Sequence, residues 1–319
     1  MKLPLKPPVQ PQLAKSSRVL PDGEQWRYEP KWDGFRAIVF RDGDEVHLQS
    51  RNGKELNRYF PEVVEQVLAT SPRRVVMDGE LVVMVDGAQE FDLLSQRIHP
   101  AASRVEMLAR EMPAQLVAFD LLAEGEETLL ELPYDERRER LAALVEDPVL
   151  LTPGTADPAG AGEWLAGTGE GVMAKVGSAP YRPGERVGMV KIKRERTADA
   201  VVAAFRWGKE EGTVGSLILG MYDDEGKLHV VGHTSSFKKT EKRELTGLLE
   251  PYRTHERGAG EPSRWKSDEE LVWEGLRPEL VCEVKFDHIT GHRIRHGAKF
   301  ARWRDDKEPR ECLISQLRD

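Results

Sequence analysis

The sequence is poor in cysteine and contains no long apolar run. Only Cys282 and Cys312 occur among its 319 residues, and neither belongs to a Cys-x-x-Cys pair. We therefore expect neither a disulfide framework nor a zinc ribbon, and a reducing cytoplasm fits best. No apolar stretch approaches the roughly 18 residues that cross a bilayer. Residues 1–10 also lack the apolar run of a signal peptide.

The chain also lacks the positive net charge expected of a protein that binds nucleic acid. It carries 47 Lys and Arg against 55 Asp and Glu, a net charge of −8. Binding depends on where charges lie, however, and not on their sum. Acids crowd at Glu124–Glu127 and Asp268–Glu270. Basic residues gather in two groups, Lys191, Lys193, Arg194 and Arg196, then Arg293, Arg295, Lys299, Arg302 and Arg304. This uneven distribution is compatible with a polyanionic partner.

The length and patterning predict two domains, because 319 residues exceed what one core usually organises. In the first part, strands and helices alternate. The predicted strands are Trp26–Tyr28, Phe35–Phe40, Val46–Ser50, Val75–Val85, Gln89–Phe91, Gln115–Leu122, Gly171–Val176 and Met189–Lys193. The predicted helices are Pro61–Ala69, Ser103–Glu111 and Asp135–Glu146.

After Arg196 the pattern changes to short strands with one helix. The predicted strands are Val201–Arg206, Ser216–Tyr222, His229–Gly232 and Leu280–Phe286, and the helix is Lys242–Tyr252. This pattern suits a small β-barrel such as an OB-fold. With Arg194-Glu195-Arg196 as the expected hinge, we predict domains at residues 1–195 and 196–319.

The segment Glu29–Arg36 contains the first chemical signal. Lys31 stands two residues before Asp33-Gly34, between two predicted strands. A free lysine, with a pKa near 10.4, is protonated and attacks nothing. Nearby cations or a bound metal can lower that pKa and expose the amine as a nucleophile. Alone, the short pattern is better interpreted as a turn with an exposed lysine.

Further short motifs follow in order along the chain. They are Ser50–Gly53, Asp78–Leu81, Phe119-Asp120, Glu170–Lys175 and Lys191–Lys193. Together with the segment around Lys31, they resemble the motifs of the covalent nucleotidyltransferases: ATP-dependent DNA ligases, RNA ligases and mRNA-capping enzymes. The resemblance implies an α+β fold. A nucleotidyltransferase (adenylation) domain of antiparallel sheets with helices would precede a C-terminal OB-fold β-barrel.

The resemblance also implies a nucleophile and its cations. Lys31 would attack the α-phosphorus of ATP and carry a covalent AMP. Lys191 and Lys193 lie at alternate positions of a strand, so both side chains can reach the α-phosphate. Lys175 would add a third cation, and Asp33 would support the reacting lysine. An exposed strand edge is the alternative interpretation of the late lysines.

Other motif residues would bind the nucleotide and Mg²⁺. Arg36 and Arg51 would contact the sugar and phosphates, or form ordinary surface ion pairs. Glu80 and Glu170 would bind Mg²⁺ or the ribose, since Mg²⁺ prefers a few carboxylates completed by phosphate and water; a surface acid in a turn is the alternative. In the base pocket, Phe119 would stack on adenine, Met173 would close its other face, and Glu29 would read its amino group. Plain core packing is the alternative for the two apolar residues.

The segment Phe300–Lys307 resembles the last motif of DNA ligases, Arg-x-Asp-Lys. In that family the motif lies on the OB domain and closes over ATP. Arg304 and Lys307 would neutralise the departing pyrophosphate, and Asp306 would orient it.

The segments Arg277–Val284, His99–Arg104 and Tyr181–Gly184 resemble the stand-alone bacterial type C ligases and the ligase module of bacterial end-joining enzymes. We assign no chemical role to the last two. The chain departs from many relatives at Met189, where they carry Trp. Only thirty residues precede Lys31, so we expect neither a nicotinamide-mononucleotide domain nor a helical DNA-clamping domain.

We therefore expect an ATP-dependent DNA ligase that seals nicks during DNA repair, using ATP and Mg²⁺. Its partners would be nicked duplex DNA and an end-binding repair protein, with no membrane involved. A monomer in the bacterial cytoplasm, associated with the nucleoid when acting, is expected. The alternatives are an RNA ligase, a GTP-dependent capping-type enzyme, or an OB-fold nucleic-acid-binding protein without catalysis.

Overall fold

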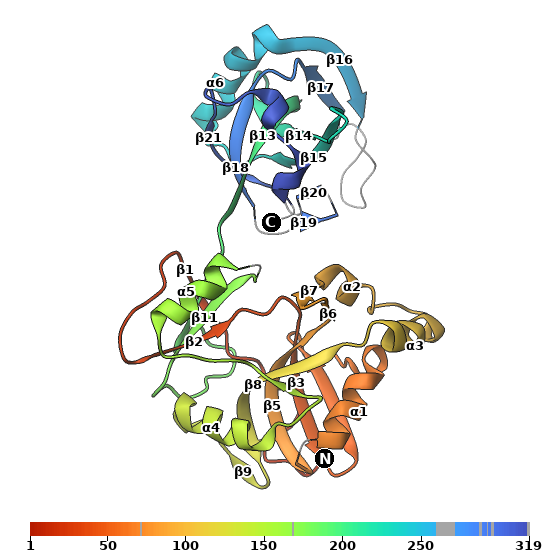
Figure 1. Cartoon of the computed structure of the whole chain (residues 1–319), viewed down its shortest axis with the longest axis vertical. Helices are drawn as coiled ribbons and strands as arrows, with labels where there is room; N and C mark the ends of the chain where they lie inside the picture. The colour runs from red at the N-terminus through yellow and green to blue at the C-terminus, as the bar shows by residue number, and fades with distance from the viewer. Residues whose placement is uncertain are drawn as a thin grey trace. The chain divides into compact units, whose positions relative to one another are not determined.

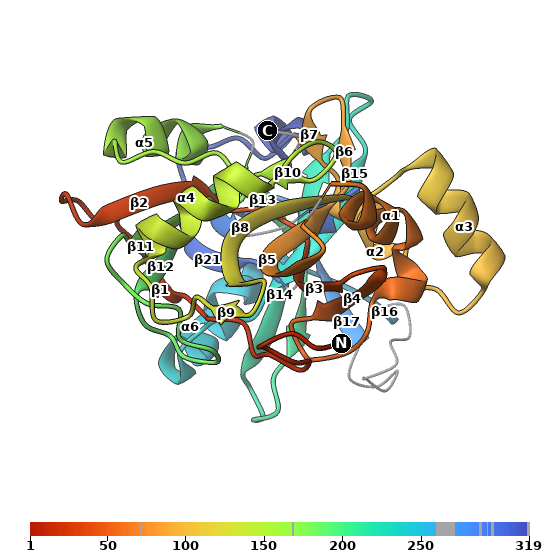
Figure 2. The same ribbon diagram turned by 90° about the horizontal axis from the view of Figure 1, so that it is seen from below.

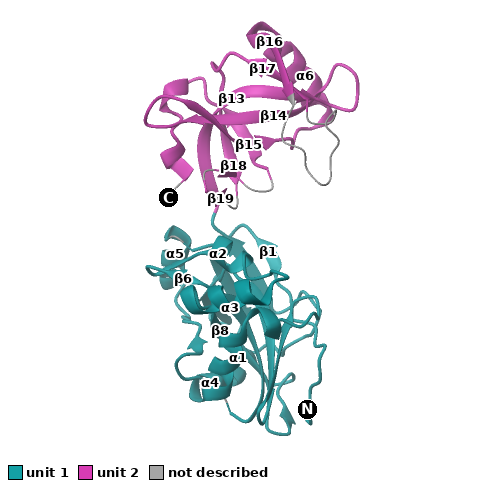
Figure 3. Cartoon of the chain, turned by 90° about the vertical axis from the view of Figure 1, so that its right-hand side faces the viewer, with its two compact units in different colours: residues 1–194 teal, residues 195–319 magenta. Residues whose placement is uncertain are grey.

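The computed structural model describes residues 1–70, 72–167, 169–259, 272–286, 289–291, 293–294 and 297–317. It forms two compact units, Met1–Arg194 and Glu195–Asp319 (Figure 3). Arg295 and Asp268–Glu270, which the sequence assigns to charged clusters, lie outside the described residues. Within the described chain, no helix is long and apolar enough to cross a membrane.

A six-stranded sheet forms the centre of unit 1 (Figure 1). Its strands run in the order β10 (Leu150–Leu151), β8 (Gln115–Glu124), β5 (Arg74–Val82), β3 (Phe35–Asp42) and β4 (Glu45–Ser50), with β9 (Glu127–Thr128) beside β8. Both faces of β3 are buried because alternate residues serve two cores. Ala37 and Val39 face a core shared with helices, whereas Ile38 and Phe40 pack against the N-terminal residues Leu3 and Leu5.

The helices on the first face are α1 (Pro61–Thr70), α2 (Phe91–Ser95) and α4 (Tyr134–Leu144), each of which contributes leucine or valine to that core. Helix α3 (Ala102–Glu111) lies near α1 at the edge of the unit (Figure 2). The short hairpin β6 (Met84–Val85) and β7 (Ala88–Gln89) turns at Asp86-Gly87. The predicted strand Gln89–Phe91 is wrong at Phe91, which begins α2 and packs its ring on Phe35.

A second sheet of four strands completes unit 1. Its order is β1 (Lys15–Ser17), β12 (Met189–Lys193), β11 (Gly171–Val176) and β2 (Trp26–Pro30). Helix α5 (Pro158–Ala166) covers one face and shares a core with Tyr28, Val172 and Ile192. The sequence analysis missed α5, which is short and glycine-rich but is capped by Asp157, whose Oδ1 accepts the Ala159 N–H at 2.9 Å.

Unit 2 is a curled antiparallel sheet around one core, as an OB-fold requires. Its strands are β13 (Arg196–Trp207), β14 (Val214–Tyr222), β15 (Leu228–Thr234), β16 (Arg253–Ala259), β17 (Val272–Leu276), β18 (Val281–Phe286), β19 (Ile289–Thr290), β20 (Arg293–Ile294) and β21 (Lys299–Trp303). Helix α6 (Lys239–Leu249) contributes Leu245 and Leu249 to the core. Short 3-10 turns lie at Glu250–Tyr252, Pro309–Glu311 and Ile314–Leu317 in this unit, and at Asn57–Tyr59 in unit 1.

Candidate functional site

A cavity of about 670 Å³ lies in unit 1, and residues of both its sheets line it. The alternation of β11 and β12 explains why charged side chains gather there. Val172 and Ile192 point to the core under α5, so Met173, Lys175 and Lys191 point to the opposite face and line the cavity. The cavity also receives most of the sequence-predicted site residues: Glu29, Lys31, Asp33, Arg36, Arg51, Glu80, Phe119 and Glu170.

Lys31 follows the end of β2 and is fixed by its backbone, whose N–H donates to Gly171 O at 2.8 Å. Its Nζ forms an ion pair with Glu170 Oε2, and Lys193 Nζ lies 3.0 Å from Glu170 Oε1. One carboxylate thus contacts two lysines. Burial acts to raise the pKa of Glu170, but the two lysines outweigh it and lower that pKa below its usual value.

Lys191 lies beside this group on the same face of β12. Its pKa is lowered, first by burial and then by the neighbouring charges of Lys31 and Lys193. Three ammonium groups therefore converge next to one carboxylate, which is an arrangement that suits an anionic ligand. The structure brings Lys31, Lys191 and Lys193 together around Glu170.

Gly34 allows the segment around Lys31 to pass close to β5. A Cβ placed on Gly34 would lie 2.1 Å from Leu81 O and 2.9 Å from Glu80 Cγ. Only glycine permits that approach. It sets the start of β3 against Glu80, whose pKa burial raises to about 7.

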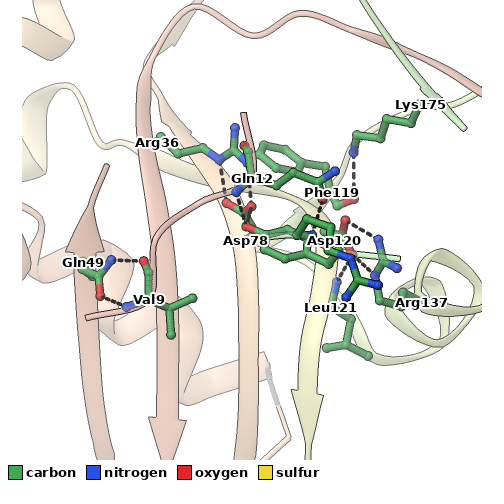
Figure 4. A network of polar contacts seen from close by, with 12 residues as sticks. Val9, Gln12, Arg36, Gln49, Asp78, Phe119, Asp120, Leu121, Arg137 and Lys175 are labelled. Carbon is green, nitrogen blue, oxygen red and sulfur yellow. Dashed lines mark hydrogen bonds and ion pairs between the residues drawn. The ribbon is translucent and has the colours of Figure 1, made fainter. Parts of the chain in front are cut away.

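Arg36 is held by a carboxylate that the sequence analysis left without a role. Its Nε and Nη2 each donate to Asp78 at 2.6 Å, one to each oxygen (Figure 4). Asp78 is fully buried, and the Arg36 guanidinium lies 4.7 Å from the Phe119 ring centroid. The phenol of Tyr181 also donates to Asp78. This bidentate pairing fixes the plane of the guanidinium at the cavity wall.

Glu29 forms a second buried cluster. Lys175 Nζ lies 2.6 Å from Glu29 Oε2, and the Tyr134 hydroxyl donates to Glu29 Oε1. The ammonium of Lys175 also lies 4.7 Å from the ring centroid of Phe119. Lys175, expected as a third cation for the phosphates, thus stands with the residues expected around the base.

The remaining predicted residues divide between the units. Asp33, Arg51 and Met173 line the cavity, and Met173 is in register with Glu29 on one side and Lys191 on the other. The residues of the predicted Arg-x-Asp-Lys motif form ion pairs within unit 2. Arg304 Nη1 lies 2.8 Å from Asp199 and its Nε 2.8 Å from Asp306, while Lys307 lies 3.5 Å from Glu311.

Sequence reasoning missed four residues that hold the site: Gln12, Asp78, Tyr134 and Tyr181. For two of them a signal existed, since Asp78 and Tyr181 stood inside segments already singled out. Gln12 and Tyr134 gave none, because a glutamine in an extended segment and a tyrosine starting a helix are ordinary surface residues in a sequence.

The carboxylates at the cavity suit Mg²⁺ bound together with a nucleotide, and they do not form a complete metal site by themselves. The described residues contain no group of three or more His, Cys, Asp or Glu that could hold a metal by itself. Glu80 and Glu170 line the same cavity. One or two carboxylates completed by phosphate oxygens and water are what Mg²⁺ uses in nucleotide sites.

Two family models match the chain. The "ATP dependent DNA ligase domain" covers residues 11–193, and the "ATP dependent DNA ligase C terminal region" covers residues 210–307. Among curated proteins, "DNA ligase C1" of Mycolicibacterium smegmatis is 47 % identical over 99 % of this chain and 96 % of its own length. "DNA ligase C" of Mycobacterium tuberculosis is 44 % identical over the same shares.

Solved structures show the same relationship. A mycobacterial DNA ligase D complexed with ATP and MES is 29 % identical, with a TM-score of 0.53 over 96 % of this chain and 98 % of that one. The ligase domain of M. tuberculosis LigD is also 29 % identical over the same shares, with a TM-score of 0.52.

Proposed function

The chain belongs to the ATP-dependent DNA ligases, and on that premise we propose that it seals nicks through a covalent AMP on Lys31. The observation that carries this assignment of the nucleophile is the ion pair of Lys31 and Glu170, both of which line the cavity; Lys193 also contacts the Glu170 carboxylate. The relatives' names speak for DNA as substrate, against the RNA-ligase, capping and non-catalytic alternatives.

In the first step, the Lys31 amine attacks the α-phosphorus of ATP after losing its proton. A nitrogen–phosphorus bond forms, the bond to the bridging oxygen breaks, and pyrophosphate departs with that electron pair. Lys191 and Lys193 offset the negative charge that spreads over the phosphoryl oxygens. Phe119, Met173 and Glu29 hold the base, and Arg36 and Arg51 hold the sugar and phosphates.

Bound Mg²⁺ would supply further charge compensation on the phosphates. Glu80 and Glu170 are the residues that would hold it. In unit 2, Arg304, Asp306 and Lys307 would orient the leaving pyrophosphate, with Asp33 supporting Lys31 in unit 1. The AMP then passes to the 5′-phosphate at a nick, and the neighbouring 3′-OH displaces AMP and closes the strand.

We propose that the enzyme acts as a monomer on nicked duplex DNA during repair and recombination, at the nucleoid, with an end-binding protein as further partner. The two units offer separate basic residues for the phosphate backbone. Because binding would depend on contacts between these residues and the phosphates, we expect the affinity for a bare nick to be modest and sensitive to salt.

The deciding experiment is the intact mass of the protein after incubation with Mg²⁺ and ATP, with GTP in parallel. We expect an AMP-sized adduct from ATP alone, absent in Lys31→Ala and discharged by nicked DNA. Lys227→Ala, on an exposed turn, is the matched control and should retain the adduct. An adduct from GTP, or one that survives in Lys31→Ala, would refute the proposal.

A further inference from the structure

The loop between β11 and β12 contains Tyr181–Gly184, a motif with no role in the proposed chemistry. The extended segment at residues 11–13 binds this loop along its length. Gly184 has a φ of +75°, a backbone conformation that strongly favours glycine. The hydrogen bonds are Leu13 N to Glu185 O (2.8 Å), Gly184 N to Pro11 O (3.3 Å), Gln12 Nε2 to Val187 O (2.6 Å) and Arg182 N to Gln12 Oε1 (3.1 Å).

Tyr181 is the buried end of this contact, with 1 % of its surface exposed. Its hydroxyl accepts the Gln12 N–H at 2.9 Å and donates to Asp78 Oδ2 at 2.6 Å. Burial and the charge of Asp78 raise the pKa of Tyr181 well above its usual value, so the hydroxyl keeps its proton. Tyr181 is thus a fixed donor to Asp78.

Asp78 in turn fixes Arg36. Two guanidinium nitrogens donate to Asp78, and Nη2 also donates to Gln12 O at 3.3 Å. A guanidinium carries five N–H donors. Arg36 Nη1 has no hydrogen-bond partner among the described residues. Arg36 also lines the cavity. The protein therefore orients one edge of the guanidinium and leaves Nη1 available for a ligand in the cavity that Arg36 lines.

Each member of this network depends on the next because Asp78 is completely buried. A buried carboxylate needs all its donors, and losing one lets its partners move. The Arg36 guanidinium also lies over Phe119, so its displacement would disturb the surface on which the base stacks. Figure 4 shows Gln12, Arg36, Asp78 and Phe119 close together.

We propose that Tyr181, with the backbone of Gln12, is a positioning residue for ATP: it fixes Asp78 and, through it, the orientation of Arg36 toward the nucleotide. This inference rests on the proposed function and extends it to the Tyr181–Gly184 loop and the N-terminal segment. Tyr181 acts through Arg36 and touches no reacting atom. It should therefore affect ATP binding more than the chemical step.

The test is the single-turnover rate of adduct formation against ATP concentration. Tyr181→Phe should raise the half-saturating ATP concentration roughly tenfold and change the maximal rate less than about twofold, as expected for a lost hydrogen bond to a charged group. In an Arg36→Lys background, the same change should shift half-saturation less than about twofold. A general packing defect would give equal effects in both backgrounds and would overturn the inference.

Two control variants separate this role from general damage. Tyr28→Phe removes another buried hydroxyl, which donates to Pro21 O at 2.7 Å outside the cavity. Gln49→Ala removes two hydrogen bonds to the backbone of Val9, which lies outside the segment 11–13 that contacts the loop. Both should keep the wild-type ATP dependence, and an equal defect in either one contradicts the inference.

If Tyr181→Phe does not fold, Gln12→Ala, which removes two anchors of the loop, takes its place with the same expected shift. Wild-type ATP dependence in the folded variant overturns the inference while the proposed function stands. Absence of any adduct in the wild type refutes the proposed function, and the inference falls with it.

Discussion

Glu170 is the residue whose contacts matter most for the proposed reaction of Lys31. Its carboxylate is shared by Lys31 and Lys193, both within ion-pair distance. Without it, the ammonium groups would repel one another and Lys31 would lose its fixed position. The same two lysines lower the pKa of Glu170.

Glu170→Gln is therefore expected to slow adduct formation about 100-fold or more, the usual effect of removing a group that organises transition-state charge. The measurement is the single-turnover rate at saturating ATP. Glu163→Gln, on the exposed side of α5, is the control and should react at the wild-type rate. A Glu170→Gln enzyme of wild-type rate would remove this carboxylate from the mechanism.

At the scale of elements, the close approach of the segment around Lys31 to β5 depends on Gly34. The Cβ of Gly34→Ala would meet the backbone oxygen of Leu81, which cannot rotate away. We expect a loss of about 1–3 kcal/mol in the free energy of unfolding, measured by urea denaturation. Gly162→Ala in α5, where a Cβ meets nothing within 4 Å, should be neutral or stabilising by up to about 1 kcal/mol. Equal stabilities for both variants would show that the close approach tolerates a side chain.

In unit 2, Glu274 on β17 joins three strands. It is 2 % exposed, accepts Trp207 Nε1–H at 2.8 Å and lies 2.5 Å from Arg253 and 2.9 Å from Arg257. Burial acts to raise its pKa, but the Trp207 hydrogen bond and the arginines outweigh it, and the net pKa is lowered. A depressed folded-state pKa stabilises the protein above the unfolded value and loses that contribution as pH falls.

Glu274→Gln should therefore lower the free energy of unfolding by about 2 kcal/mol at pH 7, because the arginines lose their counter-charge. The difference between wild type and variant should shrink as pH falls below about 4.5. Urea unfolding of the full chain across that range measures it. Glu279→Gln, which breaks the exposed pair with Arg277, should cost less than about 0.5 kcal/mol at any pH. A constant difference for Glu274→Gln would refute the electrostatic explanation.

For the whole molecule, the net charge of −8 repels DNA, although the proposed function requires the protein to bind it. Binding must come from local basic residues that release counterions from the backbone. Raising the salt from about 50 to 200 mM should weaken nick binding at least about tenfold, measured by fluorescence anisotropy. An uncharged osmolyte at matched osmolality is the control. Binding that is insensitive to salt would contradict a phosphate-based grip.

The sequence predicted the main strands of both units, and most of the site residues that it predicted line the cavity. The strands β11 and β12 lie where Gly171–Val176 and Met189–Lys193 were expected. Such strands can be predicted because the alternation of side chains between the two faces of a strand is a local property of the sequence. The sequence missed β16 and β17 and misassigned Phe91, where short segments take their form from packing against distant residues.

The sequence by itself determined which residues could do chemistry: the order of motifs around Lys31, Glu170 and Lys191–Lys193 fixes their types and, through strand alternation, their common face. Only the tertiary structure decided which of them meet. It joined Lys175 to Glu29, closed Asp78 on Arg36, and brought Gln12 to Tyr181, 169 positions along the chain. Contacts between segments so far apart arise when sheets and loops pack, and no local pattern encodes them.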